Sequence, residues 1–511
     1  MQEQSGGSPQ GKRSLQEQRV SVFQNWFSVI GSILSVVFFS AILVLAILDF
    51  RSQEVNPYLG IVTYMIAPVF LVISLILIPL GALWEHRLRL KGEHKQHFPV
   101  FDFNNPRHQR RAYFIIGVVT VFLLFTIVGI YRAYEFTESV TFCGQTCHQV
   151  MSPEYKAYQH SPHARVACVE CHVGSGVGSY VRSKLAGTNM LYSLMLNKYH
   201  RPVETPIRNL RPAQDTCEKC HWPQKFFGAI EKDKEYFLSD EKNTAWTTRM
   251  LLFVGGAMAP YGKGKGIHWH MNINNKITYV ATDKKRQVIP WVKIIHPDGQ
   301  EDVYIDTESK NKTGQPPVGE IRRMDCMDCH NRPSHNFKAP FNAVNEAMSF
   351  DLIDRSLPFI KREAVKALDA DYPSEEAAVF SIQQKLEEFY KNKYPQVYAD
   401  QKNSLDRSIA EVVDIYKTNM FPSMKSSWKA YPENIGHLIS SGCFRCHDNK
   451  HKTSDGKVLS NDCTLCHSII EQGHIGSTEK SADGLPFRHP EEGEEGWKEG
   501  SCVECHTGGS Q

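Results

Sequence analysis

Three long uncharged segments interrupt the first 131 residues of the chain. They cover residues 29–48, 61–83 and 112–131. A helix of about 20 apolar residues is long enough to cross the hydrocarbon core of a bilayer. Buried core helices seldom repeat this pattern three times in succession. The first run is also longer than the apolar part of a signal peptide, and no small-x-small cleavage site follows it. The pattern therefore predicts three transmembrane helices.

The distribution of Lys and Arg predicts the orientation of these helices. The loop at 49–58 contains only Arg51, whereas the loop at 85–111 contains seven basic residues. Positive charge is enriched in short cytoplasmic loops. We therefore expect the polar tail at 1–21 and the basic loop at 85–111 to be cytoplasmic. The three helices make up the membrane part at 22–136, and everything after it is predicted to be periplasmic.

The periplasmic part changes character along its length. Residues 137–225 are rich in turns and show little helical periodicity, whereas 226–325 include a β-rich stretch. Within it, two apolar β-branched runs at 277–281 and 288–295 precede the turn signal Pro297-Asp-Gly. These signals predict a small hairpin or sheet.

Helical periodicity returns at 342–418, within a segment that we place at 326–430. Pro373-Ser374 is a suitable start for the helix that includes 377–390. The last segment covers 431–511. The predicted fold is thus a three-span α-helical membrane anchor plus a large periplasmic multihaem c-type cytochrome region, which is mostly helical and irregular with a small β element.

The haem part of this prediction comes from the cysteines. All 14 occur as pairs, and a His follows each pair directly. The motifs are Cys143/Cys147 with His148, Cys168/Cys171 with His172, Cys217/Cys220 with His221, Cys326/Cys329 with His330, Cys443/Cys446 with His447, Cys463/Cys466 with His467 and Cys502/Cys505 with His506. C-x-x-C-H is the attachment sequence of c-type haem. The sequence predicts seven covalently bound haems, with each His as proximal iron ligand.

Two other uses of paired cysteines explain the pattern less well. Neither a zinc ribbon nor a disulfide framework needs a His after every pair. The first motif departs from the others, because three residues separate its cysteines. Haem is attached outside the cytoplasmic membrane, which agrees with the orientation predicted from the basic loop. The net charge of +3 gives no sign of a nucleic-acid partner.

Electron-transfer haems usually take a second axial ligand, His or Met. His160, His296 and His474 are better explained as surface residues. The candidates for this distal position are Met151, His163, His200, His268, His270, His335, His437, His451 and His489. Alternatively, Met151 packs against the first haem without binding its iron. The histidines outside the motifs are numerous enough for haem irons to be held by two histidines each.

Lys184 follows the second haem motif by twelve residues, close to the predicted membrane face. Oxidation of a quinol releases protons with the electrons, so its site needs a polar or ionisable group. Lys184 is suited to hydrogen-bond a quinol oxygen. Contact of Arg182 and Lys184 with lipid head groups explains the same charges equally well.

Residues 142–192 resemble the NapC/NirT family of membrane-anchored multihaem quinol dehydrogenases. The resemblance is carried by Ser161-Pro-His163-Ala-Arg-Val-Ala-Cys168-Val-Glu-Cys171-His172 and by the first motif with Met151. It implies that His163 is a distal haem ligand, that Met151 ligates the first haem, and that Lys184 belongs to the quinol site. Two features depart from the family: the first motif and the spacing to Met151 are each one residue longer, and Met190 stands near the position of an acidic residue in some members.

Three spans and seven haems resemble inner-membrane cytochromes of metal-reducing bacteria. The resemblance implies a quinol dehydrogenase that oxidises menaquinol at the periplasmic face of the inner membrane. Its electrons would reach soluble periplasmic c-type cytochromes and then an extracellular acceptor such as a metal. A homo-oligomer is compatible with the sequence. The alternatives are an electron conduit without its own quinone site and a terminal oxyanion reductase.

Overall fold

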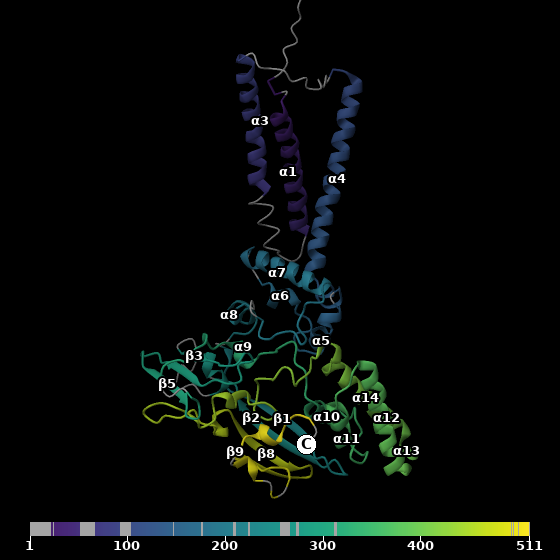
Figure 1. The fold of residues 1–511 in the computed structure, drawn as a ribbon, viewed down its shortest axis with the longest axis vertical. Coiled ribbons are helices and arrows are strands. Elements are labelled where there is room, and N and C mark those ends of the chain that lie inside the picture. Colours follow the sequence, from purple (N-terminus) through teal and green to yellow (C-terminus); the bar gives the residue numbers. More distant parts are fainter. Residues whose placement is uncertain are drawn as a thin grey trace, which may run out of the picture. The chain divides into compact units, whose positions relative to one another are not determined.

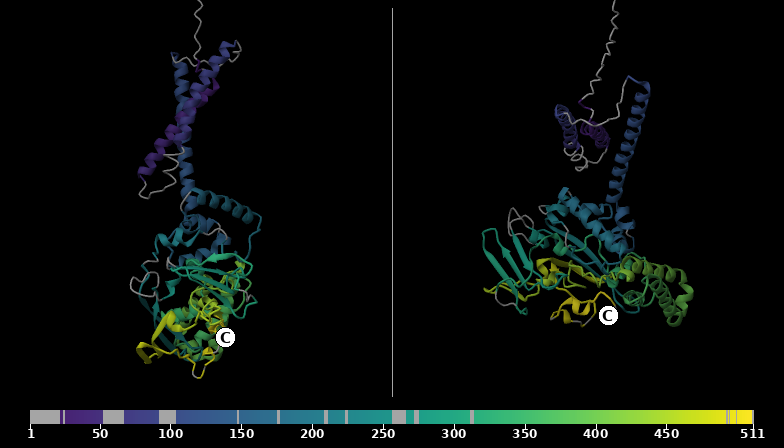
Figure 2. Two further views of the ribbon diagram at one scale, coloured as in Figure 1. Left: turned by 90° about the vertical axis from the view of Figure 1, so that its left-hand side faces the viewer. Right: turned by 45° about the horizontal axis from the view of Figure 1, so that its top comes forward.

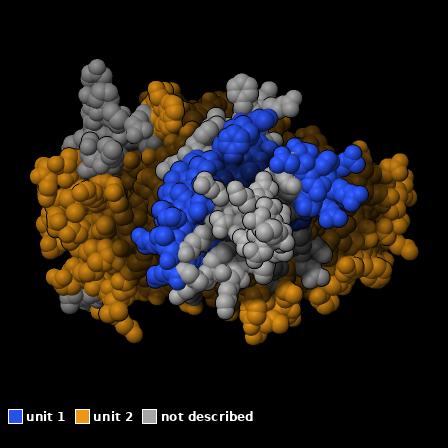
Figure 3. Space-filling model, turned by 90° about the horizontal axis from the view of Figure 1, so that it is seen from above, with its two compact units in different colours: residues 1–137 blue, residues 138–511 orange. Residues whose placement is uncertain are grey.

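The computed structural model describes residues 22–51 except 24, 67–91, 104–146, 148–174, 177–207, 211–222, 225–255, 266–271, 275–310 and 314–509 except 492, 494 and 499. The chain forms two compact units, Met1–Thr137 and Glu138–Gln511, which Figure 3 colours separately. We call them unit 1 and unit 2 and describe each by itself.

Unit 1 contains three long apolar helices, α1 (Trp26–Arg51), α3 (Ala67–Leu90) and α4, which runs from Pro106 to Glu138 at the start of unit 2. Each has a segment long and apolar enough to cross a membrane. This confirms three candidate spans. Residues 61–66 of the predicted second span lie outside the described residues.

Small and polar residues bring α1 and α3 close together. A Cβ atom added at Gly31 would lie 2.9 Å from the backbone oxygen of Ser74, and one added at Gly81 would lie 2.5 Å from Oδ1 of Asn25. The Ser28 hydroxyl donates a hydrogen bond of 2.8 Å to the carbonyl of Ile78. Small residues and interhelical hydrogen bonds are the usual means by which helices associate in lipid.

In unit 2, a helical insert has its own apolar core. It consists of α10 (Pro340–Ser349), α11 (Ile360–Asp369), α12 (Glu375–Lys393), α13 (Pro395–Asp400) and α14 (Lys402–Asn419). Ser374 caps α12 by accepting a hydrogen bond from the Ala377 amide, which confirms the predicted helix start. Ile382, Leu386 and Leu405 are among the core side chains.

In the described part of unit 2, nine strands form two antiparallel sheets. Sheet A has the order β1 (Ala229–Phe237), β2 (Ala245–Phe253), β8 (His467–His474) and β9 (Ser477–Leu485). Sheet B has the order β6 (Ile321–Arg323), β3 (Lys276–Val280), β4 (Trp291–Ile295), β5 (Glu301–Asp306) and β7 (His451–Lys452). Figures 1 and 2 show sheet B and the helical insert at opposite ends of unit 2, with sheet A between them.

The predicted hairpin is present as β3 and β4, and the Pro297-Asp-Gly turn leads from β4 to β5. The prediction of a small β element was incomplete, because sheet A, a second small sheet, was not located. Its outer strands read AIEKDKEYF and STEKSADGL and lack an apolar face. Each outer strand pairs with its neighbour in sequence, but the two central strands, β2 and β8, lie more than 200 residues apart in the chain, so no local pattern marks their pairing.

The remaining elements of unit 2 are mostly short. They include α5 (His148–Gln159) and α7 (Val177–Met195), which flank the second Cys-His motif. Single turns are η2 (Phe142–Thr146), α6 (Cys168–His172), α8 (Ala213–Thr216), η3 (Cys217–Lys219), η5 (Ile267–Met271), α9 (Cys326–Cys329), η6 (Pro422–Met424), η7 (Gly442–Arg445), η8 (Cys463–Leu465), η9 (Gly496–Lys498) and α15 (Cys502–Cys505). Most of these turns contain residues of a Cys-His motif.

Candidate functional site

Each of the six C-x-x-C-H motifs contains a single helical turn, which is α-helical in the second, fourth and seventh motifs and 3-10 in the third, fifth and sixth. In the third, fourth and seventh motifs, the amide of the motif His donates a hydrogen bond of 2.8 Å to the carbonyl of the first Cys. Residues three apart in a helical turn lie on the same face. The turn therefore presents both thiols together, as attachment to one porphyrin requires. None of the thirteen described cysteines is in a disulfide.

Several of the predicted attachment cysteines differ from buried structural thiols in being open to solvent. The exposed ones among the described cysteines are Cys171, Cys220, Cys463 and Cys505. Cys220 ends the turn of the third motif, where its amide donates a hydrogen bond of 3.2 Å to the Cys217 carbonyl. Reactive cysteines are at least partly exposed, whereas buried ones are inert. The exposure of Cys220 therefore suits a thiol that reacts with a haem vinyl group, and its thioether bond stays a prediction.

The first motif contains an additional residue, and its chain forms a π-helical turn, η2. A π turn closes over one more residue than an α turn, so it accommodates the longer spacing. Gly144 allows the turn to pack on Tyr155, because a Cβ atom there would lie 2.2 Å from the ring. Cys147 and the His148 side chain lie outside the described residues.

Each of the six other motif histidines lies next to a histidine from outside the motifs. The pairs are His163 with His221, His172 with His335, His268 with His330, His270 with His447, His437 with His467 and His489 with His506. Their ring centres are 5.9 to 6.4 Å apart. Two imidazoles that bind one metal ion from opposite sides at about 2 Å have ring centres roughly 6 Å apart. These residues therefore fit an iron held by two histidines.

Backbone carbonyls orient several of these rings. Nδ1 of His268 lies 2.7 Å from the Val254 oxygen, and Nδ1 of His335 lies 3.0 Å from the Glu154 oxygen. A hydrogen bond at Nδ1 fixes the tautomer and leaves Nε2 available for a metal ion. His270 and His447 have corresponding contacts with the carbonyls of Ile267 and Ser460. Burial also lowers the pKa of His335 to about 4, so its ring is neutral near pH 7.

Two predicted distal candidates are placed elsewhere. Both ring nitrogens of His451 have partners, with Nδ1 2.9 Å from Asp448 and Nε2 2.7 Å from the carbonyl of Ile289. Burial opposes protonation of His451, but these hydrogen bonds prevail and raise its pKa. His200 is exposed and lies 4.0 Å from Glu204. Neither ring faces a described motif histidine in the way that the six paired rings do, so we leave both residues out of the proposed ligand set.

In each of the first six motifs, a thiol interacts with a thiol of the next motif along the chain, either by a hydrogen bond or electrostatically. The neighbours are Cys143 and Cys168, Cys171 and both Cys217 and Cys220, Cys217 and Cys326, Cys329 and Cys443, Cys443 and Cys466, and Cys463 and Cys502. In the first of these pairs, a hydrogen bond from Cys143 lowers the pKa of Cys168 to about 7. The attachment sites therefore adjoin one another in the order of the sequence. Spacing alone did not predict this order.

Lys184, the predicted quinol-site residue, lies on α7 and contacts the carboxylate of Glu138 at the end of α4. The Glu138 side chain is 16% exposed and that of Lys184 is 36% exposed. The charges of both residues act on the thiol of Cys143 in the first motif. Next to Lys184 on α7, the apolar side chains of Val181 and Leu185 are exposed. This arrangement places an ion pair and apolar surface beside the first haem site.

Sequence reasoning missed Glu138. Its carboxylate comes from a position 46 residues before Lys184. The family resemblance directed attention to the neighbourhood of Met190, where no acidic residue stands. The sequence signal was an acidic residue seven positions after the third predicted span, on the membrane side of the first motif.

Comparison with known proteins identifies related chains. Residues 105–219 match the N-terminal region of the NapC/NirT cytochrome c family. The cytochrome c-type protein ImcH of Geobacter sulfurreducens is 40% identical over 494 residues, which are 95% of this chain and 96% of ImcH. The cytochrome c-type protein NrfH of Wolinella succinogenes is 26% identical over 156 residues, 30% of this chain and 86% of NrfH. No solved structure matches.

Proposed function

The chain belongs to the NapC/NirT cytochrome c family as a membrane-inserted relative of ImcH, and from this premise we propose that it is a menaquinol dehydrogenase of the inner membrane. Unit 2 faces the periplasm in this proposal. Its electrons pass to soluble periplasmic c-type cytochromes and serve extracellular respiration, including that of metals. The single observation that carries the proposal is the Lys184–Glu138 ion pair beside the first haem-binding motif.

Seven c-type haems supply one-electron carriers when they are bound to the seven motifs. We assign the six His pairs as axial ligands of haems 2 to 7, numbered by motif. Met151, on α5 three residues after His148, is the proposed distal ligand of haem 1. This assignment leaves His200 and His451 outside the ligand set. It also leaves no open iron position at haems 2 to 7, as an oxyanion reductase would need.

The residues beside the first motif are suited to bind a quinol and accept its protons. The ammonium group of Lys184 donates a hydrogen bond to a quinol oxygen, while Val181 and Leu185 provide apolar surface for the lipid-soluble tail. Oxidation of one quinol to the quinone releases two electrons and two protons. The Glu138 carboxylate accepts these protons one at a time and passes them to water, since a positioned carboxylate is an effective general base.

Reduction of the purified full-length protein in detergent by a menaquinol analogue tests this proposal. Haem absorbance follows the reaction. We expect rapid reduction of the native protein and a loss of about tenfold or more in rate for Lys184→Ala and Glu138→Gln, as is typical for removal of an acid–base group. Arg182→Ala is the matched control, because Arg182 is exposed on the same helix. We expect it to react at nearly the native rate.

Two outcomes would contradict the proposal. If the analogue fails to reduce a protein whose haems dithionite reduces fully, the chain is a conduit that needs a partner subunit. If Arg182→Ala and Lys184→Ala slow the reaction equally, both residues act through lipid head groups.

A further inference from the structure

The fourth and fifth motifs are connected by more contacts than those of their thiols. One short turn, η5, carries both His268 and His270. His268 pairs with the motif His of the fourth site, and His270 pairs with that of the fifth. The charge of Cys443 in the fifth motif also acts on the thiol of Cys329 in the fourth. The two sites therefore share a distal segment, η5.

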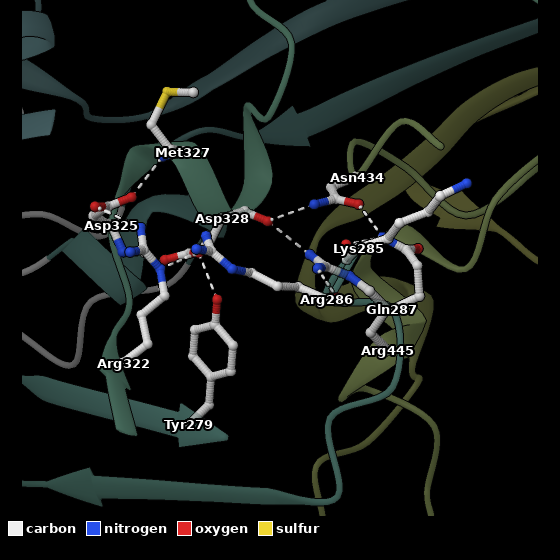
Figure 4. A network of polar contacts seen from close by, with 10 residues as sticks. All are labelled: Tyr279, Lys285, Arg286, Gln287, Arg322, Asp325, Met327, Asp328, Asn434 and Arg445. Carbon is white, nitrogen blue, oxygen red and sulfur yellow. Dashed lines mark hydrogen bonds and ion pairs between the residues drawn. The ribbon is translucent and has the colours of Figure 1, made fainter. Parts of the chain in front are cut away.

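A buried carboxylate lies inside the fourth motif at this junction. Asp328 is 3% exposed. Its Oδ1 accepts hydrogen bonds of 2.6 Å from the Tyr279 hydroxyl and 2.8 Å from Nε of Arg322, and Arg286 lies 3.4 Å away (Figure 4). Its Oδ2 accepts from the Asp325 amide and completes a capping box of α9. These bonds fix the turn that carries Cys326 and Cys329.

Arg445 joins this carboxylate cluster to the fifth motif, in which it stands between Cys443 and Cys446. Its guanidinium donates three hydrogen bonds of 2.8 Å, to the backbone oxygens of Gly442, Arg286 and Asp328. Asn434 also donates to the Asp328 carbonyl, at 3.0 Å. Figure 4 shows Arg445 and Asn434 on the same side of Asp328. A planar fork of donors suits such a three-point contact, whereas an ammonium group supplies no equivalent geometry.

The charged groups at this junction differ in how they are paired. Arg286, Arg322 and Arg445 supply three positive charges, and Asp325, Asp328 and Asp448 supply three negative charges, of which Asp448 acts on Cys446 and pairs with His451. Arg322 forms ion pairs with both Asp325 and Asp328, at 2.9 Å from Asp325 and 2.8 Å from Asp328. A positive charge near an iron centre in a low dielectric favours the state with the additional electron. The hydrogen bonds of Arg445 all go to neutral carbonyls, so its positive charge is not neutralised by a direct ion pair in these contacts.

We propose that Arg445 is a positioning residue that holds haems 4 and 5 as one rigid pair and raises their midpoint potentials. The inference rests on the haem assignment of the proposed function, but it is independent of the quinol site. Haems bound at the fourth and fifth motifs would then be held in a fixed relation to each other by residues of this chain, and Arg445 would supply a positive charge close to both.

Two substitutions separate the geometry from the charge. Arg445→Gln removes the positive charge and most of the hydrogen-bond donors of the guanidinium group. Arg445→Lys keeps the charge but loses the planar arrangement of donors. Arg323→Gln is the control, because Arg323 is an exposed arginine on the adjacent strand β6. The full-length protein is purified in detergent, and its haem content is measured first. A potentiometric titration with chemical mediators and electron paramagnetic resonance of the ferric haems then follow, without quinol.

We expect Arg445→Gln to retain seven haems, to lower two of the seven midpoint potentials and to lose the magnetic coupling between two haems. Arg445→Lys should keep the potentials and lose the coupling, and Arg323→Gln should change neither. Unchanged potentials and coupling in Arg445→Gln would overturn the proposal. If that variant does not accumulate with seven haems, Arg445→Lys decides the positioning role, and native coupling there would overturn it. Failure of menaquinol to reduce the native protein would contradict the proposed function and leave this result unaffected.

Discussion

The helical insert and the first haem-binding segment of unit 2 are stabilised in different ways. The insert, residues 340–419, buries many apolar side chains in one core. Residues 142–222 contain three motifs, yet their described buried hydrophobic residues are only Ala157, Tyr158 and Ala213. Burial of apolar surface is the main favourable contribution to folding. The insert has that contribution from its own sequence, whereas the haem-binding segment lacks it.

Besides a small apolar cluster around Ala157 and the Arg332–Glu154 ion pair, the haem-binding segment is held by its motif contacts. His163 and His172 reach His221 and His335, and the Cys143 thiol reaches that of Cys168. A bound group whose ligands come from distant residues contributes its binding free energy to folding. The comparison therefore indicates that haem replaces the core in this segment, while the insert folds without haem.

Loss of haem 2 should have the largest effect of the changes that test this comparison. In Cys168→Ala/Cys171→Ala, the segment 142–222 loses a covalent centre with ligands from two segments. We expect this segment to become sensitive to protease while the insert stays resistant. Limited proteolysis of the purified protein with mass spectrometry measures both. Equal resistance of the two segments in the variant would contradict the comparison.

The same contrast explains what the sequence could predict. The transmembrane helices, the motifs, the β3–β4 hairpin and the start of α12 at Ser374 are specified by neighbouring residues. The described His pairs and the Lys184–Glu138 contact depend on residues far apart in the chain. His172 and His335, for example, are separated by 162 residues. Short spacing identified His335 as a candidate but gave no information on which motif it joins.

Sheet A could not be predicted from neighbouring residues either. Trp246 pairs with His474 across most of unit 2. Several residues of strand β1 in sheet A are charged. This strand therefore lacks the alternation of apolar and polar residues that marks a half-buried strand. Long-range pairing is determined by the packing of the whole unit, so local propensity cannot reveal it.

A cavity in the insert should have an intermediate effect and leave the haems unchanged. Leu386 on α12 is 1% exposed within the core. Leu386→Ala should lower the free energy of unfolding by about 2 to 5 kcal/mol, because it removes buried methyl groups and leaves a void. Urea unfolding followed by circular dichroism measures the loss, and the haem absorbance spectrum gives the haem state.

Leu352→Ala is the matched control, since Leu352 is 52% exposed. It should change the urea midpoint little. Loss of haem from Leu386→Ala before the insert unfolds would mean that the two segments depend on one core, against the comparison.

The smallest expected effect concerns a buried cation where the insert meets sheet A. Lys361 on α11 is 1% exposed, donates to the carbonyl of Phe237 and to Asn345, and lies 4.1 Å from the centre of the Phe341 ring. Burial lowers the pKa of Lys361 from 10.5 to about 7. Between these values the unfolded chain holds a proton that the folded chain has lost. Stability therefore rises with pH through this window and is lowest below about pH 7.

We expect the native protein to gain about 2 kcal/mol between about pH 7 and pH 9.5 from Lys361, because its hydrogen bonds offset part of the cost of burial. Thermal unfolding in detergent at the two pH values measures this gain. Lys361→Met should lose this pH dependence, while Lys366→Met, at an exposed position of the same helix, should keep it. If Lys361→Met kept the native slope, the lysine would be charged throughout, stabilised by its two carbonyl partners. The insert would then depend on polar contacts with sheet A as well as on its apolar core, and the contrast with the haem-binding segment would be one of degree.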